Sequence, residues 1–130
     1  CELAKAAGAK RALVLPVSAP FHSILLKPAA DVLAEALVKV EMNAPQINVI
    51  NNVDVLVETD MLKIRDALVR QAYSPVRWVE CVTAMANQGV TDLVECGPGK
   101  VLAGLAKRIN ARVSGHGLVD QASLATILKI

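Results

Sequence analysis

The sequence predicts an α/β fold: a largely parallel sheet with helices on its faces. Short apolar segments typical of buried strands alternate along the chain with segments whose apolar residues recur at helical spacing. Hydrophobic residues make up 54% of the 130 residues and aromatic residues only 2%, so the core must be aliphatic. Near-continuous aliphatic runs are typical of parallel strands that are buried on both faces. A chain of this length can bury about two-thirds of its unfolded surface, so size alone requires neither a disulfide nor a metal.

The start of the chain is predicted to contain a short helix, a strand and a loop. The helical pattern over 2–7 ends at Gly8, and glycine is the preferred residue for a left-handed helix end. The apolar segment 11–17 predicts a strand. It leads into the proline-containing segment 18–23, which predicts a loop.

A helix and an interrupted strand are predicted next. The helix begins at about Pro28, because the missing N–H of proline is tolerated in a first turn, and it ends before Pro45. The apolar stretch 47–57 then predicts a strand. Asn51 and Asn52 break this strand, because asparagine favours turns and strand ends.

Helices and strands continue to alternate in the second half. Asp60 is predicted to cap a helix that ends at Gln71. A helix over 76–88 follows, with Gly89 at its left-handed end. The segment 91–96 then predicts a buried strand.

The end of the chain repeats the same pattern. The residues 97–99, Gly-Pro-Gly, predict a turn, and a helix over 100–109 follows it. A last strand near Val113 and Val119 precedes a helix from Ser123. Strands separated by helices in this way indicate a parallel sheet.

Charge and hydropathy argue against two classes of partner. The formal net charge is +2 without a run of Lys or Arg, and three aromatic residues are too few for a stacking platform, so we expect no nucleic acid. The longest charge-free run, 12–26, contains two prolines and is shorter than the roughly 20 apolar residues of a membrane span. We therefore expect no membrane segment.

The cysteines and the first residues predict the cellular context. Three cysteines without C-x-x-C spacing indicate neither a disulfide framework nor a zinc site. We expect reduced thiols in a cytoplasmic protein. The chain has no initiating Met and enters a helical pattern at once, so we expect that it begins inside a longer protein.

The segment 97–100, GPGK, joins a strand to a helix, where backbone amides can bind anions. A phosphate-binding loop needs G-x-x-x-x-G-K-[ST]. Here the fifth residue before Gly99 is Val94, and Val101 follows the lysine. We interpret the segment as a tight turn between a core strand and a helix.

His22 is a candidate for chemistry, because a rigid loop between a strand and a helix can aim a side chain at a cleft. On position alone, a hydrogen-bonded loop histidine without a further role is an equally good interpretation. Ser23 is its direct neighbour and poorly arranged as a nucleophile, and the sequence contains no G-x-S-x-G elbow. His116, between two glycines, is expected to lie in an exposed mobile loop without a role.

Seven short blocks stand out along nearly the whole chain. In this order and spacing they resemble the carboxy-terminal part of bacterial malonyl-CoA:acyl carrier protein transacylases. A single block such as GPG is a weak signal, whereas seven in register are a strong one. The blocks are PVSAPFH at 16–22, KPAA at 27–30, NAP at 43–45, NNVD at 51–54, IRDALVRQ at 64–71, PVRW at 75–78 and ECGPGKVL at 95–102.

The resemblance implies a two-step acyl transfer in fatty acid biosynthesis, with no bound cofactor and no metal. An active-site serine takes the malonyl group from malonyl-CoA as an ester and gives it to the phosphopantetheine thiol of acyl carrier protein. His22 matches the family's catalytic histidine, the general base and acid of both steps. Gln71 matches the residue whose backbone carbonyl accepts the other ring N–H. The last carbonyls of a helix lack intrahelical partners, which suits this role.

Phe21 directly precedes the histidine, at a position where some transacylases carry Ser. In related polyketide synthase acyltransferases, Phe at this position goes with malonyl and Ser with the bulkier methylmalonyl. The resemblance therefore makes Phe21 a candidate substrate-binding residue in the pocket wall. The alternative is simple packing.

The family's G-H-S-x-G nucleophile elbow, carboxylate-binding Arg and oxyanion-hole Gln have no counterpart in these 130 residues. We therefore expect the missing amino-terminal part of the same enzyme as a partner, and no activity from this chain alone. The resemblance places residues 1–17 at the end of a small ferredoxin-like subdomain. It places 18–130 in the carboxy-terminal part of a large hydrolase-like subdomain with a mainly parallel sheet.

Two other interpretations stay open. The chain could be a non-catalytic fragment or scaffold in which the blocks determine only the fold. It could also be a piece of a polyketide synthase acyltransferase domain, although the NNVD block at 51–54 and the GPGK block at 97–100 favour the stand-alone fatty acid enzyme.

Overall fold

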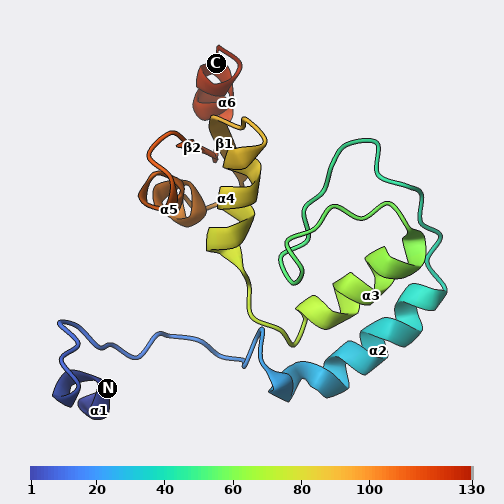
Figure 1. Cartoon of the computed structure of the whole chain (residues 1–130), viewed down its shortest axis with the longest axis horizontal. Helices are drawn as coiled ribbons and strands as arrows, with labels where there is room; N and C mark the ends of the chain where they lie inside the picture. The colour runs from blue at the N-terminus through green and yellow to red at the C-terminus, as the bar shows by residue number, and fades with distance from the viewer. Residues whose placement is uncertain (130) are drawn as a thin grey trace.

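The computed structural model describes residues 1–129 as a separate N-terminal helix, a pair of packed helices and a C-terminal α/β unit (Figure 1). Long segments without regular structure follow the first helix and connect the paired helices. The elements are α1 (Glu2–Ala6), the 3-10 helix η1 (Ile24–Leu26), α2 (Lys27–Val38), α3 (Met61–Gln71), α4 (Trp78–Asn87), β1 (Asp92–Cys96), α5 (Val101–Ile109), β2 (Ser114–Leu118) and α6 (Gln121–Ile127).

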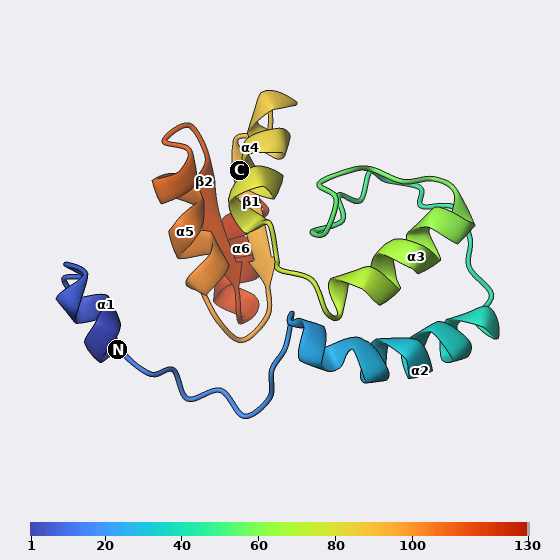
Figure 2. The same ribbon diagram turned by 60° about the horizontal axis from the view of Figure 1, so that its bottom comes forward.

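The C-terminal unit is built around two parallel strands, β1 and β2. Their register pairs Asp92 with Ser114 at one end and Cys96 with Leu118 at the other. Parallel strands need a crossover connection, and α5 supplies it while packing against the strands (Figure 2). The predicted α/β class and the parallel pairing are confirmed on this small sheet.

The helices α2 and α3 lie side by side in both views (Figures 1 and 2). α3 begins as predicted, because the carboxylate of Asp60 accepts hydrogen bonds from the backbone N–H groups of Leu62 and Lys63, at 2.8 and 3.1 Å. The buried residue of each helix is an alanine, Ala30 in α2 and Ala67 in α3. Side chains this small let the two helices approach closely, so that the start of α2 meets the end of α3.

The predicted strand over 11–17 is wrong. No strand within residues 1–129 pairs with this segment, which connects α1 to η1 without regular structure. Its side chains Leu13, Val14 and Leu15 are exposed. An apolar segment becomes a strand only where a neighbouring strand takes up its backbone hydrogen bonds, and the local pattern does not report whether that neighbour exists.

The interrupted strand predicted over 47–57 is reduced to one antiparallel bridge between Ile50 and Val57. The break falls where the asparagines predicted it, since the side chain of Asn51 accepts from the N–H of Asp54 at 2.7 Å and closes a turn. The segment 47–57 therefore contains a turn with a short bridge in place of a strand.

The strand predicted over 91–96 is β1, but it is not buried. Val94 is 41% exposed, because β2 is the one strand that pairs with β1 within the described residues. A parallel strand with one neighbour leaves its other edge and part of its faces uncovered.

The remaining helices lie where predicted, with small shifts at their ends. The helix predicted over 76–88 is α4, and Gly89 after it has the left-handed φ of 91°. The last helix begins at Gln121, earlier than the predicted Ser123. Its cap is Asp120, whose carboxylate accepts from the N–H of Ser123 at 2.7 Å.

His116 lies in β2, so the prediction of an exposed mobile loop is wrong. It pairs in register with Val94, and its Nε2 lies 2.8 Å from Oδ1 of Asp92 on the neighbouring strand. Its neighbour Gly115 is required by packing, because a Cβ at this position would overlap the backbone oxygen of Ala103 in α5. Glycine here allows the helix to contact the strand directly.

The buried apolar core is small, and many large aliphatic side chains remain exposed on 13–17, α2, α3 and α5. Much of the hydrophobic 54% of the chain therefore has no cover within residues 1–129. In the same residues no helix is both long and apolar enough to cross a membrane. The buried apolar residues are Ala30, Ala67, Cys81, Val82, Ala103, Ala106 and Val113.

We predict that Gly115→Ala destabilises the C-terminal unit by roughly 3 kcal/mol, because the added Cβ forces β2 away from the α5 backbone. Gly104→Ala is the matched control. Gly104 lies in α5 with nothing within 4 Å of an added Cβ, so its substitution is expected to stabilise by up to about 1 kcal/mol. Urea unfolding followed by circular dichroism measures both, and equal effects of the two variants would contradict the close contact.

Candidate active site

His22 and Gln71 meet although they lie 49 positions apart in the sequence. The ring Nδ1 of His22 is 2.9 Å from the backbone oxygen of Gln71. A carbonyl oxygen only accepts hydrogen bonds, so Nδ1 must carry the proton. In the neutral ring the lone pair is then on Nε2, which makes no hydrogen bond to the residues that the structure describes. This is the tautomer that can take up a proton from another molecule.

The Gln71 carbonyl is available because it belongs to the last turn of α3, whose carbonyls lack partners within the helix. Two of these carbonyls are used nearby: Val69 accepts from the N–H of Ala72 at 3.3 Å, and Arg70 accepts from the N–H of Tyr73 at 3.2 Å. The next carbonyl, that of Gln71, accepts from His22. The side chain of Gln71 takes no part in this bond.

The loop that carries His22 has an unusual backbone conformation. His22 has a φ of 58°, in the left-handed region that is rarely occupied by residues other than glycine. Such a conformation costs on the order of 1–3 kcal/mol and persists where the surroundings hold it. The loop is held by two local hydrogen bonds, from Ser23 Oγ to the Pro20 carbonyl at 2.7 Å and from the Leu26 N–H to the Ser23 carbonyl at 2.9 Å. Because Ser23 Oγ donates to Pro20, it does not point its proton at the imidazole.

Phe21 lies beside His22 in the same loop and is 63% exposed. Its ring is therefore not packed into a core within residues 1–129. The substrate-wall role and the packing role predicted for Phe21 both remain predictions, and either would need a surface that covers this ring.

The GPGK segment bends at Gly97 and Pro98 and leads into α5, whose N-cap is Lys100. A carboxylate of this chain already occupies the helix start, since Glu95 Oε2 accepts from the N–H of Ala103 at 2.9 Å. An anion bound there would have to compete with this carboxylate, which agrees with the interpretation of the segment as a tight turn.

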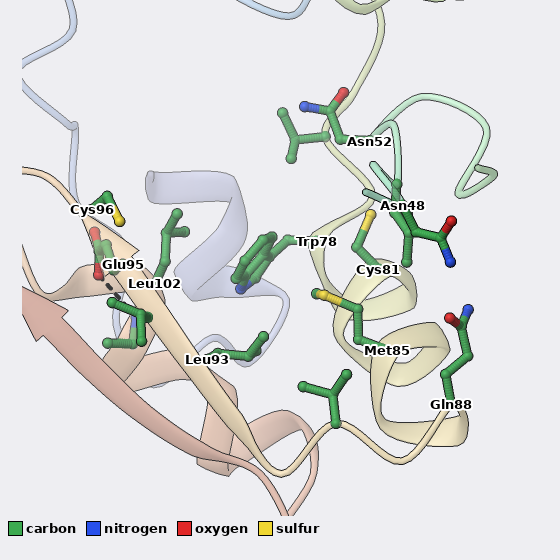
Figure 3. A pocket seen from close by; sticks show the side chains of 15 residues that line it. Asn48, Asn52, Trp78, Cys81, Met85, Gln88, Leu93, Glu95, Cys96 and Leu102 are labelled. Atoms are coloured by element: carbon green, nitrogen blue, oxygen red, sulfur yellow. Dashed lines mark hydrogen bonds between the residues drawn. The ribbon is translucent and has the colours of Figure 1, made fainter. Parts of the chain in front are cut away.

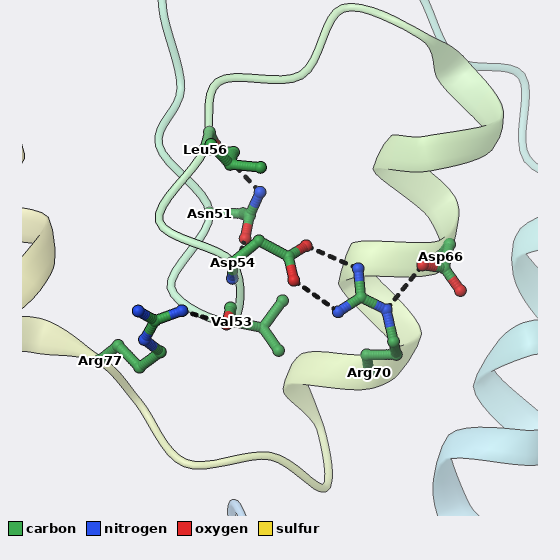
Figure 4. Close-up of polar contacts among 7 residues, drawn as sticks. All are labelled: Asn51, Val53, Asp54, Leu56, Asp66, Arg70 and Arg77. Carbon is green, nitrogen blue, oxygen red and sulfur yellow. Dashed lines mark hydrogen bonds and ion pairs between the residues drawn. The ribbon is translucent and has the colours of Figure 1, made fainter.

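A group of charged residues next to Gln71 was missed by the sequence reasoning (Figure 4). The guanidinium of Arg70 donates from Nη1 and Nη2 to the two carboxylate oxygens of Asp54, at 2.7 and 2.6 Å, and from Nε to Asp66 at 2.6 Å. The hydrogen bonds from Arg70 hold the pKa of Asp54 below its ordinary value of 3.8, and those from Asp54 and Asp66 raise the pKa of Arg70. Asp54 and Arg70 both lie in the recognised blocks, but no local spacing rule connects two residues on a loop and a later helix.

Two grooves lie beside these residues. The larger, of about 780 Å³, runs between α4, β1 and the segment 48–52, and it does not include His22 or Gln71 (Figure 3). Trp78 and Asn52 line it, and the buried Trp78 Nε1 and Asn52 Oδ1 have no hydrogen-bond partner among residues 1–129. The smaller groove, of about 310 Å³, includes Gln71 in its lining. Among residues 1–129, no three His, Cys, Asp or Glu side chains gather as metal ligands.

Comparisons with known proteins give a consistent result, although no protein-family model matches the chain. A malonyl CoA-acyl carrier protein transacylase from Salmonella typhimurium is 56% identical over 124 residues, which is 95% of this chain and 40% of that protein. A protein of the same name from Bacillus subtilis is 45% identical over 123 residues, which is 95% of this chain and 39% of that protein.

Solved structures agree with the sequence matches. The crystal structure of an acyl-carrier-protein S-malonyltransferase from Burkholderia pseudomallei has a TM-score of 0.93 and 62% identity, over 100% of this chain and 42% of that chain. A malonyl-transacylase in complex with its type II PKS acyl-carrier protein has a TM-score of 0.93 and 54% identity, over 98% of this chain and 41% of that chain.

The matched proteins share a class, since all four are named transacylases or S-malonyltransferases. Over nearly its whole length, the chain matches the carboxy-terminal part of bacterial malonyl-CoA:acyl carrier protein transacylases. The chain spans about 40% of the length of the curated relatives that it matches.

We predict that the link between Asp54 and Arg70 is lost in acid. Because the pKa of Asp54 is lowered in the folded protein, the link contributes its full stabilisation above the unfolded-state pKa of about 4 and loses it as the pH falls through the lowered value. The free energy of unfolding of the wild type should exceed that of Asp54→Asn at pH 7, and the difference should shrink below about pH 4. Urea unfolding at a series of pH values measures this difference in the free energy of unfolding. A difference that does not change with pH would contradict a stabilising ion pair between Asp54 and Arg70.

Proposed function

We propose that this chain is the base-bearing part of an enzyme that moves a malonyl group from malonyl-CoA to the phosphopantetheine thiol of acyl carrier protein, in fatty acid biosynthesis. The observation that carries the proposal is the hydrogen bond from His22 Nδ1 to the Gln71 carbonyl, at 2.9 Å. It leaves Nε2 as the proton acceptor that a serine nucleophile requires. The names and high identities of the relatives support the same activity.

In the first half-reaction, Nε2 of His22 takes the hydroxyl proton of an active-site serine as the serine oxygen attacks the malonyl thioester carbonyl. The resulting imidazolium keeps its Nδ1–H on the Gln71 carbonyl. When the carbon–sulfur bond breaks, the proton on Nε2 passes to the sulfur of coenzyme A. A malonyl-serine ester remains, and the imidazole is neutral again.

The second half-reaction again uses Nε2 of His22 to take up and return a proton. Nε2 of His22 takes the proton of the pantetheine thiol, and the thiolate attacks the ester carbonyl. When the carbon–oxygen bond breaks, the proton on Nε2 returns to the serine oxygen. A neutral carbonyl stabilises the imidazolium less than a carboxylate would, and the negative end of the α3 dipole at Gln71 offsets part of this difference.

The serine, the residue that binds the malonyl carboxylate and the oxyanion donors come, in this proposal, from an amino-terminal part of the same enzyme. Two facts support this partner. The 130 residues contain no G-x-S-x-G, and the chain spans about 40% of its relatives. The exposed aliphatic side chains and the larger groove beside β1 offer apolar surface to such a part.

The proposed partition of the chain assigns residues 1–17 to the end of a small ferredoxin-like subdomain and 18–130 to a hydrolase-like core with a mainly parallel sheet. Support comes from α1 and the segment after it, which lie apart from the remaining elements in both views (Figures 1 and 2). His22 would then lie next to the junction of the two subdomains. The proposed location is the cytoplasm, where the thiols of Cys1, Cys81 and Cys96 stay reduced.

In the complete enzyme, we predict that His22→Ala lowers the rate of malonyl transfer by about 10²–10⁴-fold, the usual contribution of a general base. Gln71→Ala should keep most of the activity, because the acceptor is a backbone carbonyl that alanine also has. Radiolabelled malonyl transfer to acyl carrier protein measures both variants. A loss for Gln71→Ala as large as that for His22→Ala would contradict the backbone role, and full activity of His22→Ala would contradict the proposed function.

We also propose that Phe21 forms a wall of the acyl pocket, because it directly precedes His22 and its ring is 63% exposed within this chain. Replacing it by the smaller serine should admit a methyl branch, so Phe21→Ser is expected to increase the ratio of methylmalonyl to malonyl transfer by roughly tenfold, the scale of one methylene in a pocket. Competition between the two coenzyme A esters measures the ratio. An unchanged ratio would leave Phe21 with a packing role alone.

A further inference from the structure

The Gln71 carbonyl belongs to the last turn of α3, so its position depends on the contacts that hold this turn. The same contacts therefore affect the orientation of the His22 ring, which donates to this carbonyl. We propose that Asp54 and Arg70 form a positioning pair that holds the end of α3 and, through the Gln71 carbonyl, the orientation and tautomer of the His22 ring. This inference rests on the proposed function for the consequence in catalysis. The placement of the His22 ring does not depend on the proposed function.

The contact between Arg70 and Asp54 restrains orientation as well as distance. Two parallel hydrogen bonds, at 2.7 and 2.6 Å, join the planar guanidinium to the planar carboxylate (Figure 4). Such a fork resists both sliding and rotation, unlike a contact through one atom pair. Both side chains are about two-thirds covered, with exposures of 32% for Arg70 and 28% for Asp54, so solvent screens this pair less than a fully exposed one.

The pair is anchored firmly on the α3 side. Arg70 directly precedes Gln71, and its own carbonyl accepts from the N–H of Tyr73 at 3.2 Å. Its Nε donates to Asp66, one turn earlier on the same helix, at 2.6 Å. The side chain therefore has a fixed direction relative to the helix, and a displacement of the guanidinium moves the last turn with it.

The loop that carries Asp54 is also held in one conformation. The N–H groups of Asn51 and Val55 donate to the carbonyls of Leu56 and Asn51, at 3.0 and 3.1 Å. Val55 has a φ of 61°, a strained value for a β-branched residue that persists only where surrounding contacts determine it. The loop thus gives Asp54 a defined position.

A second tie connects this loop to the next helix. The N–H of Arg77, at the start of α4, donates to the carbonyl of Asn52 at 3.0 Å. The Asp54 carboxylate therefore links the end of α3 to a loop that is itself attached to α4.

His22, by contrast, lies in an exposed loop with the left-handed φ of 58°. Its ring has one hydrogen bond to the described residues, the 2.9 Å contact with Gln71. A displacement of the carbonyl is not compensated by a second acceptor. Misplacement of a reacting group by 1 Å costs about 10²-fold in rate, so a smaller shift is enough to be measured.

The test uses the complete enzyme and three variants. Asp54→Asn removes the charge and one acceptor oxygen with little change in volume. Arg70→Lys keeps the positive charge and loses the planar fork. Asp92→Asn is the matched control, since Asp92 is also a partly covered carboxylate, 2.8 Å from Nε2 of His116, and this contact involves no residue of α3 or of the loop that carries Asp54.

We expect Asp54→Asn to lower kcat by about tenfold with the KM for malonyl-CoA unchanged within a factor of two, because the proton acceptor is displaced and the substrate contacts are not. ¹⁵N spectra of the imidazole should show the Nδ1–H tautomer in the wild type and a mixture of tautomers in this variant. Arg70→Lys should show a smaller change of the same kind, and Asp92→Asn should match the wild type in both readouts.

Two results would overturn the proposal. One is a wild-type tautomer and kcat in both Asp54→Asn and Arg70→Lys. The other is an equal loss in Asp92→Asn, which would indicate a general effect on stability. If the wild-type enzyme transfers no malonyl group, the proposed function fails, whereas the tautomer readout still decides whether the pair positions His22.

Discussion

The hydrogen bond between the ring of His22 and the backbone oxygen of Gln71 is the contact on which the candidate site depends. It joins two segments that are 49 residues apart, and it requires the loop before α2 to meet the end of α3. Alanines at the buried positions of both helices make this meeting feasible, because side chains of that size allow close approach. The acceptor is a main-chain atom at a helix end, where carbonyls lack helical partners. The residue at which α3 ends therefore determines whether the His22 ring has this acceptor.

Packing inside this chain relies mainly on small residues, with Val82 and Val113 buried beside them, whereas many of the large aliphatic side chains are exposed. Ala103 and Ala106 of α5 are buried, and Gly115 lets the helix backbone contact β2. Val, Leu and Ile are exposed along 13–17 and on the helices. The small residues accommodate contacts already made within the chain. The exposed aliphatic residues supply the surface that the proposed amino-terminal part would bury, at about 25 cal/mol per Å² of apolar area.

Charged residues in this chain act mainly as links between segments. The guanidinium of Arg70 connects α3 with the loop of Asp54. His116 and Asp92 connect the two strands, and the hydrogen bond from His116 lowers the pKa of that carboxyl. Exposed ion pairs contribute little to stability by themselves. Their value here is geometric, because each pair determines where a backbone segment lies relative to its neighbour.

Local sequence determined the helices, most of their ends and the position of β1. Asp60 caps α3 and Gly89 follows α4 as predicted, since capping depends on residues within one turn. The recognised blocks also singled out His22 and Gln71. Tertiary structure decided the rest. The segment 11–17 is no strand without a neighbour to pair with, and His116 is a strand residue because β1 lies beside it. The contact of Arg70 with Asp54 joins residues that no local period relates, because periodicity reports which face a residue occupies and not which distant residue it meets.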